Sequence, residues 1–407
     1  MRVLVSNPSL QYTRNTVKAL LTQGHEVVFA TAYWYKKNRF LERIISKTPF
    51  NKYLFRYSDA AIPDSIVLTN YWSIFLHFFL KFLPIGVEQK SYWEDLAHDR
   101  WVAQYVKKHQ PQLTIGYEKS CLQTFQVLDQ LSLVKWLDLS QVHPTFIQEL
   151  RNKYSFFKSI TGSDSLFKEI NNRKQQEYEL SNKIYCLSNF AANTLRSEKI
   201  PNEKIGVNPL GYNSKIFFAD TNSHAVEKKP IQLVYAGIIT KRKGIHLLLQ
   251  LMDLYNEDQV ELTLIGPAGD ASSLLNEYLH KTNINYISFL SHEALADQFK
   301  QADLFVFPSY LDSWAVVVLE AMACGLPVIV TENTGAAQIV TDLNGKIIPI
   351  DNLQALKTAL DYFIQYPDAR LQMGKNASTT AVAHTWQNYN DTLNTMVSKL
   401  EQSVNYV

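Results

Sequence analysis

One stretch of the sequence predicts a loop, a helix and the start of a strand: Pro308-Ser-Tyr-Leu-Asp-Ser-Trp-Ala-Val-Val-Val-Leu-Glu-Ala-Met-Ala-Cys-Gly-Leu-Pro-Val-Ile-Val-Thr331. The apolar residues 304–307 directly before it predict a short strand that ends at the proline. Helix formers at 315–323 predict a helix, which Gly325 ends at its C-cap, and Pro327 opens the next strand. This strand–helix–strand order is typical of a parallel α/β sheet.

Two carboxylates stand out in this stretch. Glu320 lies in an apolar helix, where a carboxylate is costly unless it binds a polar group, and Asp312 lies at the helix start, where anions bind well. On one helix they would be roughly 12 Å apart, wider than the about 5–9.5 Å of paired glycosidase carboxylates. The spacing favours two ends of one long ligand with a diphosphate between them, such as a nucleotide sugar. The alternative is a solvated helix residue and a turn residue.

Length and composition narrow the class of protein. A chain of 407 residues with 46% apolar and 19% charged residues predicts two globular domains, and its net charge of +2 predicts no nucleic-acid partner. Cys121, Cys186 and Cys324 show no CxxC spacing, which predicts a reducing, cytoplasmic location with no metal or disulfide framework. The chain has no GxGxxG after any predicted strand, and this argues against a dinucleotide-dependent dehydrogenase.

Alternating strand and helix patterns occur twice along the chain. The first series starts at 2–6 and the second at 231–236, so we expect two doubly wound domains with parallel sheets. Other predicted strands are 25–31, 113–117, 133–139, 183–187, 204–210, 260–265, 286–290 and 328–330. Predicted helices include 13–23, 95–109 and 171–182, with helical structure in 386–407.

One apolar run, 71–83, needs separate treatment. His77 and Lys81 interrupt it, and it is shorter than the about 18 residues of a spanning helix. Its pattern predicts a buried amphipathic helix. The alternative is a surface that contacts a membrane or a lipid-linked acceptor, which would make the protein peripheral at the inner face of the membrane.

The opening stretch is similar to the Glu-x7-Glu signature of retaining glycosyltransferases of family 4, the glycosyl transferases group 1, which have the GT-B fold. The signature here is Asp312-x7-Glu320, and 302–309, 320–329, Thr334-Gly335 and Asn344-Gly345 also fit the family pattern. The resemblance covers the whole C-terminal half and, weakly, the N-terminal half.

The resemblance implies a fold and an activity. The fold would be α/β, with two doubly wound Rossmann-like domains facing a central cleft: 1–210 on the acceptor side, with a final helix at about 388–407 packing back onto it, and 211–387 on the donor side. The enzyme would be a metal-independent, retaining hexosyltransferase without a cofactor. Its donor would be a UDP- or GDP-linked sugar, and its acceptor a glycan, a lipid-linked molecule or a small molecule. Cell-surface polysaccharide or glycoconjugate synthesis would be its setting.

The resemblance also assigns donor-side roles. Lys243, followed by Gly244, would hold the diphosphate, and Arg242 would replace the family's usual arginine, whose place Ile238 takes. Asp312 would orient the sugar and Glu320 would hold the ribose. The remaining donor-binding candidates are Gly237, Gly266, Leu290, Ser313, Trp314, Ala315 and Val316.

Roles in the first domain follow less directly. The family's glycine pair after the first strand is absent, and Asn7 and Arg14 could supply contacts instead. His143 is the candidate to face the transferred sugar, Asp138 lies closer to the expected place, and Glu118 could contact the acceptor. Two other functions stay open: a nucleotide-sugar epimerase on the same scaffold, or a non-catalytic nucleotide-sugar-binding protein.

Overall fold

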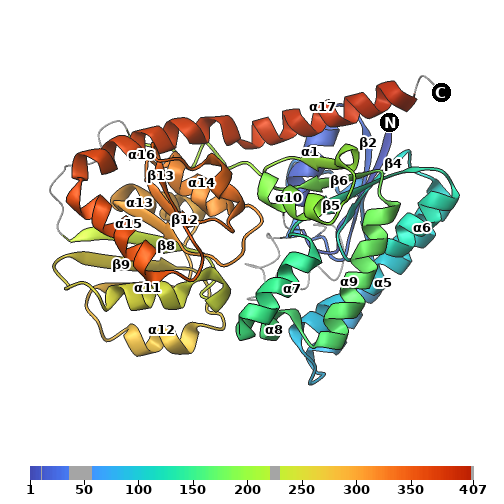
Figure 1. The fold of residues 1–407 in the computed structure, drawn as a ribbon. Coiled ribbons are helices and arrows are strands. Elements are labelled where there is room, and N and C mark those ends of the chain that lie inside the picture. Colours follow the sequence, from blue (N-terminus) through green and yellow to red (C-terminus); the bar gives the residue numbers. More distant parts are fainter. Residues whose placement is uncertain (11, 36–56, 221–229, 405–407) are drawn as a thin grey trace. The chain divides into compact units, whose positions relative to one another are not determined.

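The computed structural model describes all residues except 11, 36–56, 221–229 and 405–407, and it divides the chain into two compact units (Figure 1). Unit 1 comprises Met1–Cys186, Thr194–Asn208 and Asn390–Val407. Unit 2 comprises Leu187–Asn193 and Pro209–Tyr389. Two helices, α10 (Asn189–Ser197) and α17 (Trp386–Val404), contribute residues to both units.

Unit 1 is built on a parallel sheet of seven strands in the order β3-β2-β1-β4-β5-β6-β7. The strands are β1 (Arg2–Ser6), β2 (Glu26–Thr31), β3 (Val67–Thr69), β4 (Leu113–Tyr117), β5 (Val134–Leu139), β6 (Lys183–Cys186) and β7 (Ile205–Val207). The central strands β1, β4 and β5 are almost wholly buried, which explains their apolar sequences.

Helices cover the sheet of unit 1. They are α1 (Thr13–Thr22), α4 (Tyr71–Lys81), α5 (Val87–His109), α6 (Leu122–Gln130), α7 (Pro144–Lys153), α8 (Ser155–Thr161) and α9 (Asp164–Leu180). A buried carboxylate joins three of them: Asp99 on α5 accepts the N–H groups of Gln123 and Thr124 at 2.7 and 2.9 Å and pairs with Arg173 on α9. It thereby satisfies the free N–H groups at the start of α6.

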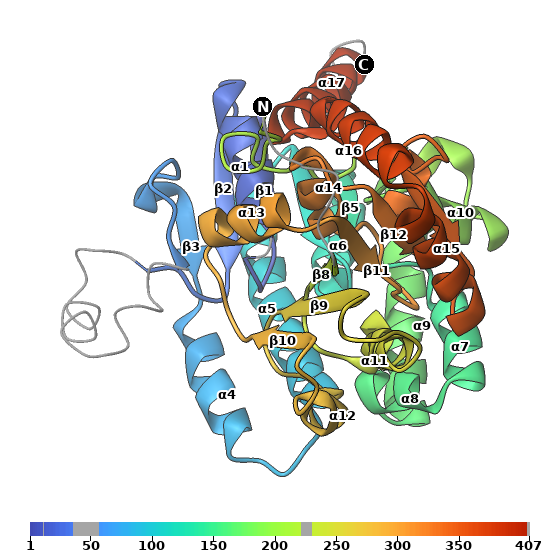
Figure 2. The ribbon, with the colours of Figure 1, turned by 90° about the vertical axis from the view of Figure 1, so that its left-hand side faces the viewer.

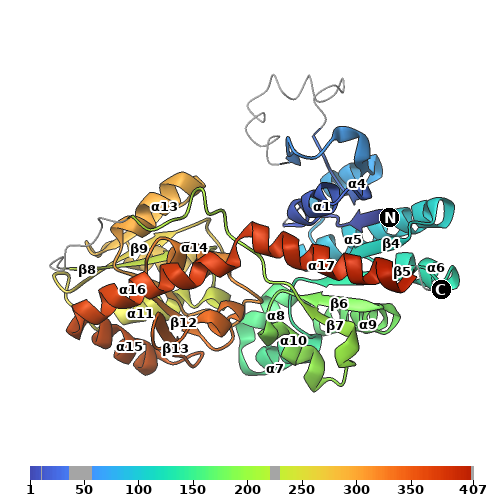
Figure 3. The same ribbon diagram turned by 90° about the horizontal axis from the view of Figure 1, so that it is seen from above.

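Unit 2 has a second parallel sheet, of six strands in the order β10-β9-β8-β11-β12-β13. They are β8 (Ile231–Ala236), β9 (Val260–Ile265), β10 (Ile284–Ile287), β11 (Leu304–Phe307), β12 (Val328–Thr331) and β13 (Gly345–Ile348). The helices are α11 (Ile245–Met252), α12 (Ser272–Tyr278), α13 (His292–Gln301), α14 (Val316–Ala323), α15 (Leu353–Gln365) and α16 (Pro367–Ala381). Figure 1 shows α11 and α12 below β8 and β9, with α13, α14 and α16 above. Figure 3 shows α16 next to α14, against which it packs.

Both sheets run outward from a central pair of strands, so the predicted pair of doubly wound α/β sheets is confirmed. The order of the strands reverses between β1 and β4 in unit 1 and between β8 and β11 in unit 2. In open parallel sheets, ligands bind at the carboxyl ends of the strands beside such a reversal. The segments after these four strands are therefore where functional side chains are expected.

Several element boundaries differ from the sequence predictions. The first long helix of unit 1, α5, begins at Val87 rather than at residue 95, and β10 ends at Ile287, before Leu290. The prediction that the run 71–83 is a buried helix is wrong: α4 packs against α5, but Trp72 and Phe75 are exposed. Figure 2 shows α4 at an edge of unit 1. Among the described residues, no helix is both long and apolar enough to cross a membrane.

Candidate functional site

An ion pair joins the two loops at the strand reversal of unit 2. Lys243 comes from the segment after β8 and Asp312 from the segment after β11, and the ammonium and the carboxylate are in direct contact. The other carboxylate oxygen of Asp312 accepts the N–H of Trp314 at 3.0 Å. The ammonium also lies 4.8 Å from the ring centroid of Phe307, within reach of a cation–π interaction. Both groups are thus fixed in place where a ligand is expected.

Burial and charge act in opposite directions on this pair. Burial lowers the pKa of Lys243 to about 8, although Asp312 opposes the shift. Burial alone would raise the pKa of Asp312, but the nearby Lys243 and Arg242 cations outweigh it and hold this pKa below its usual range. An ammonium with a pKa near 8 gains from a nearby anion, so an incoming diphosphate would stabilise its charged form.

Arg242 also belongs to this cluster, but it is tied to the backbone. Its Nη1 donates to the carbonyl of Leu311 at 2.7 Å, and its own carbonyl accepts the N–H of Tyr310 at 2.8 Å. The guanidinium therefore positions the loop that carries Asp312 and adds positive charge beside the carboxylate.

The start of α14 has free N–H groups that no side chain in the described part of the chain caps. Its N-cap residue Ala315 has a φ of +64°, an uncommon conformation for a residue with a side chain and one that occurs often at ligand sites. Gly335 and Ala336 hold the loop in place by donating to the carbonyls of Asp312 and Trp314, each at 2.8 Å. An uncapped helix start fixed in this way can receive an anion.

Trp314, which was predicted to bind the donor, is buried in the core of unit 2. Its ring is fully buried, and its Nε1 donates to the carbonyl of Leu210 at 2.7 Å. Ser313 and Val316, on either side of the buried pair Trp314–Ala315, are half-buried. They are therefore the loop side chains that a ligand could reach.

Glu320 lies on α14, one to two turns after its start. Its side chain is half-buried, and its carboxylate forms no hydrogen bond or ion pair with any residue that the structure describes. Burial alone raises its pKa to about 7. A partly desolvated carboxylate without a partner is costly in a folded protein, and a ligand with hydroxyl groups would compensate for that cost.

Glycines allow the backbones of β8 and β9 to approach at their carboxyl ends. Gly266 has a φ of +141°, and a Cβ there would lie 2.0 Å from the carbonyl oxygen of Gly237. Gly244 has a φ of +77°, and its Cβ would lie 2.1 Å from the carbonyl oxygen of Pro308. Only glycine fits these positions without backbone movement.

Leu290, another predicted donor-binding residue, is half-buried in the segment after β10.

In unit 1, two of the predicted acceptor-side residues are engaged by their own neighbours. Asn7 is fully buried, donates to Thr13 Oγ1 at 2.6 Å and accepts the Ser9 N–H at 2.9 Å. Arg14 donates to the carbonyl of Ser58 at 3.0 Å. Their side chains therefore stabilise the segment after β1 and the segment that precedes β3.

The other unit 1 candidates, Glu118 and Asp138, lie at the carboxyl ends of β4 and β5. Asp138 accepts the Tyr12 hydroxyl at 2.5 Å, and burial raises its pKa to about 7. Glu118 accepts the Tyr178 hydroxyl at 2.5 Å and pairs with Lys174 at 3.2 Å. These three partners cannot be predicted from local sequence, because they lie 126, 60 and 56 positions away along the chain.

His143 forms the N-cap of α7. Its Nδ1 accepts the N–H of Thr145 at 3.2 Å, and burial lowers its pKa. The buried Nε2 has no hydrogen-bond partner among the described residues. A neutral imidazole with one nitrogen at a helix cap could use the other to contact a substrate only after a local movement, since Nε2 is not exposed.

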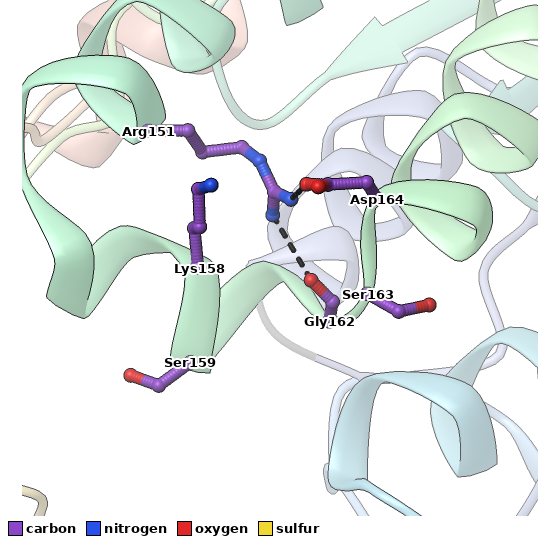
Figure 4. Close-up of a pocket in the computed structure, with 6 residues that line it drawn as sticks. All are labelled: Arg151, Lys158, Ser159, Gly162, Ser163 and Asp164. Carbon is purple, nitrogen blue, oxygen red and sulfur yellow. Dashed lines mark hydrogen bonds and ion pairs between the residues drawn. The ribbon is translucent and has the colours of Figure 1, made fainter.

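Unit 1 also has a separate hollow of about 600 Å³ around the ion pair of Arg151 and Asp164 (Figure 4). Arg151 donates to the Gly162 carbonyl at 3.1 Å as well, so its charge is already used. Lys158, Ser159 and Ser163 complete the lining. Within the described part of the chain, no group of three or more His, Cys, Asp or Glu side chains could hold a metal ion.

Comparison with known proteins connects this site to a family. Residues 217–380 match the model of the glycosyl transferases group 1, a segment that contains Lys243, Asp312 and Glu320. An uncharacterized glycosyltransferase of Methanocaldococcus jannaschii is 27% identical over 266 residues, 62% of this chain and 72% of that protein. A D-inositol 3-phosphate glycosyltransferase of Paenarthrobacter aurescens is 26% identical over 206 residues, 46% of this chain and 49% of that protein.

A third relative is the N,N'-diacetylbacillosaminyl-diphospho-undecaprenol alpha-1,3-N-acetylgalactosaminyltransferase of Campylobacter jejuni. It is 25% identical over 172 residues, 42% of this chain and 44% of that protein. The aligned segments thus span less than half of this relative and of the inositol 3-phosphate enzyme.

Solved structures with the same fold cover nearly the whole chain. The sucrose-phosphate synthase of Thermosynechococcus elongatus has a TM-score of 0.71 at 18% identity and covers 99% of this chain and 100% of its own. HepE of Anabaena, solved with UDP, has a TM-score of 0.68 at 13% identity and covers 98% and 100%. The chain therefore has the two-domain, Rossmann-like GT-B fold, and its second unit matches the glycosyl transferases group 1.

Proposed function

We propose that this protein is a retaining glycosyltransferase that transfers a sugar from a nucleoside-diphosphate sugar, using unit 2 to hold the donor. The observation that carries the proposal is the buried Lys243–Asp312 pair at the strand reversal, beside the uncapped start of α14. This arrangement offers a cation and free N–H groups to a diphosphate and a carboxylate to the sugar. Glu320, whose carboxylate has no partner among the described residues, is available for the ribose hydroxyls.

The residues have distinct roles in the proposed reaction. Lys243 and the N–H groups of α14 neutralise the charge that grows on the diphosphate as the bond between sugar C1 and phosphate oxygen breaks. In the proposed front-face step the acceptor hydroxyl oxygen bonds to C1 on the side that the diphosphate leaves, and its proton passes to the leaving phosphate. Asp312 orients the sugar hydroxyls. No metal ion takes part in this proposal.

Donor binding in unit 2 is supported by the relatives. HepE, which shares the fold, was solved with UDP and with UDP-glucose, so we take UDP-linked sugars as the first donors to test and GDP-linked sugars as the second. For the acceptor we propose a glycan or lipid-linked molecule, because a relative in Campylobacter jejuni is named for a diphospho-undecaprenol acceptor. Synthesis of cell-surface polysaccharide on the cytoplasmic side of a membrane would be the setting.

We propose that unit 1 presents the acceptor. Asp138 lies near the end of β5 and His143 follows that strand, which is next to β4 in the sheet. Both residues are candidate acceptor contacts. Glu118 is less available, because Tyr178 and Lys174 already occupy its carboxylate. Asn7 and Arg14 would act by holding the backbone after β1 and before β3.

The test is release of nucleoside diphosphate from a panel of UDP- and GDP-linked sugars, with a range of acceptors. We expect release from one donor at least, and an α-linked donor should give an α-linked product. Asp312→Asn, as a catalytically impaired control, should lower turnover more than donor affinity. If folded protein binds nucleotide without turnover across broad acceptor sampling, a binding protein is the better assignment. Exchange at sugar C2 without transfer would indicate an epimerase.

A further inference from the structure

An apolar surface on α4 of unit 1 is left uncovered by the described chain. We define the α4 surface as Trp72, Phe75, Phe79 and Phe82, whose side chains are 80, 72, 63 and 86% exposed. The described chain has only one other aromatic side chain that is more than 60% exposed, Phe289. Four such rings within eleven residues are far outside the normal scatter of exposed apolar side chains.

The helix geometry places this surface on a different side of α4 from the residues that pack on α5. At about 100° per residue, Trp72, Phe75 and Phe79 lie within an arc of about 60°. Ser73 and Leu80, which are buried, lie about 120° away and mark the side that packs on α5. A helix that is apolar on opposite sides is normally buried on both. In Figure 2, no other helix or strand of unit 1 is drawn directly to the left of α4.

The charges around α4 favour an anionic partner. Each acidic side chain at the start of α5 has a basic partner: Lys119 lies 3.2 Å from Glu88 and 3.1 Å from Asp95, and His77 lies 2.8 Å from Glu94. Lys90 makes no ion pair with the described residues, and Lys81 ends α4 with an exposed side chain.

The size of the α4 surface argues against a second copy as its partner. Four aromatic side chains of roughly 150–250 Å² each, exposed to this degree, offer about 450–750 Å². A stable protein interface buries about 800 Å² per partner with close shape complementarity. A lipid surface needs no matching shape, accepts aromatic rings at the boundary between head groups and acyl chains, and attracts flanking lysines when it is anionic.

We propose that the α4 surface docks this protein onto an anionic lipid membrane. The rings of Trp72, Phe75, Phe79 and Phe82 enter the head-group boundary, and Lys81 and Lys90 contact anionic head groups. This inference does not depend on the proposed transfer reaction. It would bring the protein to the surface where a lipid-linked acceptor is embedded.

The test is co-sedimentation of the whole protein with vesicles of phosphatidylcholine alone or mixed with phosphatidylglycerol. We expect binding to the mixed vesicles, and Trp72→Ser/Phe75→Ser should weaken it about a hundredfold, because each half-buried ring contributes roughly tenfold. Leu343→Ser, a matched change at a 70% exposed apolar residue of unit 2, should bind like the wild type. Lys81→Glu/Lys90→Glu should weaken binding to mixed vesicles alone.

Three results would overturn the proposal. They are equal binding of the double serine variant and the wild type, no sedimentation of the wild type with either vesicle, and self-association that the serine variant abolishes in the absence of vesicle binding. The last result would assign the α4 surface to a second copy. Donor turnover measured without vesicles should be the same in the serine variant, so failure of the docking proposal is distinguishable from failure of the proposed reaction.

Discussion

Replacing Glu320 by Gln should make unit 2 more stable and the protein a poorer nucleotide binder. Burial raises the pKa of Glu320 from 4.5 to about 7, and nothing in the described chain compensates its charge. A group whose pKa is raised on folding contributes stability at low pH and loses it as the pH rises through the folded value. At neutral to basic pH the charged carboxylate therefore opposes folding.

The expected gain in the free energy of unfolding follows from the pKa shift of Glu320. Each pKa unit corresponds to 1.36 kcal/mol, so the change from 4.5 to about 7 amounts to about 3 kcal/mol once Glu320 is ionised in both states. Near pH 8 we expect Glu320→Gln to raise the free energy of unfolding by about 3 kcal/mol. Near pH 5, where the folded group is already protonated, the gain should fall to about 1 kcal/mol.

The assay is urea unfolding followed by tryptophan fluorescence, to which the buried Trp314 of unit 2 contributes, at about pH 5 and about pH 8. Comparing variant and wild type at the same pH removes the titration of all other groups. Glu277→Gln, on the exposed side of α12, is the matched control and should show no pH-dependent gain. If Glu320→Gln shows the same gain at both pH values, or none, the carboxylate is not held in a desolvated position.

Three further predictions concern other contacts. Nucleoside diphosphate binding should weaken as the pH rises through about 8, because Lys243 loses its charge, and Lys243→Arg should remove that pH dependence in titration calorimetry; an unchanged pH profile would contradict the assignment. Gly266→Ala places a Cβ against Gly237 and should lower the urea stability of unit 2 by more than about 2 kcal/mol, whereas no loss would mean that the two backbones can separate. Arg173→Ala leaves Asp99 buried without its cation and should cost unit 1 about 3–5 kcal/mol in the same assay; a loss below about 1 kcal/mol would show that water reaches the carboxylate.

Local signals were sufficient to predict much of unit 2. The apolar residues of β11, the helix formers of α14 and the glycine stop at Gly325, which has a φ of +88°, act within a few positions of one another. The predicted strand, helix and turn are confirmed, because these local signals act without help from the rest of the chain. The strand β13 was not predicted, because its sequence is short and two of its residues are not buried.

Contacts between distant residues were not predictable in the same way. Lys243 and Asp312 were each predicted from the sequence of their own loops. The two residues are 69 positions apart, and they meet only because β8 and β11 are neighbours in the sheet. Glu118 looked available in the sequence because its partner Tyr178 lies on α9. The burial of α4 was overestimated, since its apolar pattern does not reveal that only one side meets α5.

The most direct measurement is the affinity for UDP and GDP of the wild type and of two matched lysine variants. Lys243→Gln removes the buried cation of the site, and Lys241→Gln removes an exposed cation two positions earlier. We expect Lys243→Gln to weaken binding at least about tenfold, because a charge-assisted hydrogen bond contributes about 1.5–3 kcal/mol. We expect Lys241→Gln to have little effect. Equal affinities in all three folded proteins would contradict a diphosphate site at Lys243.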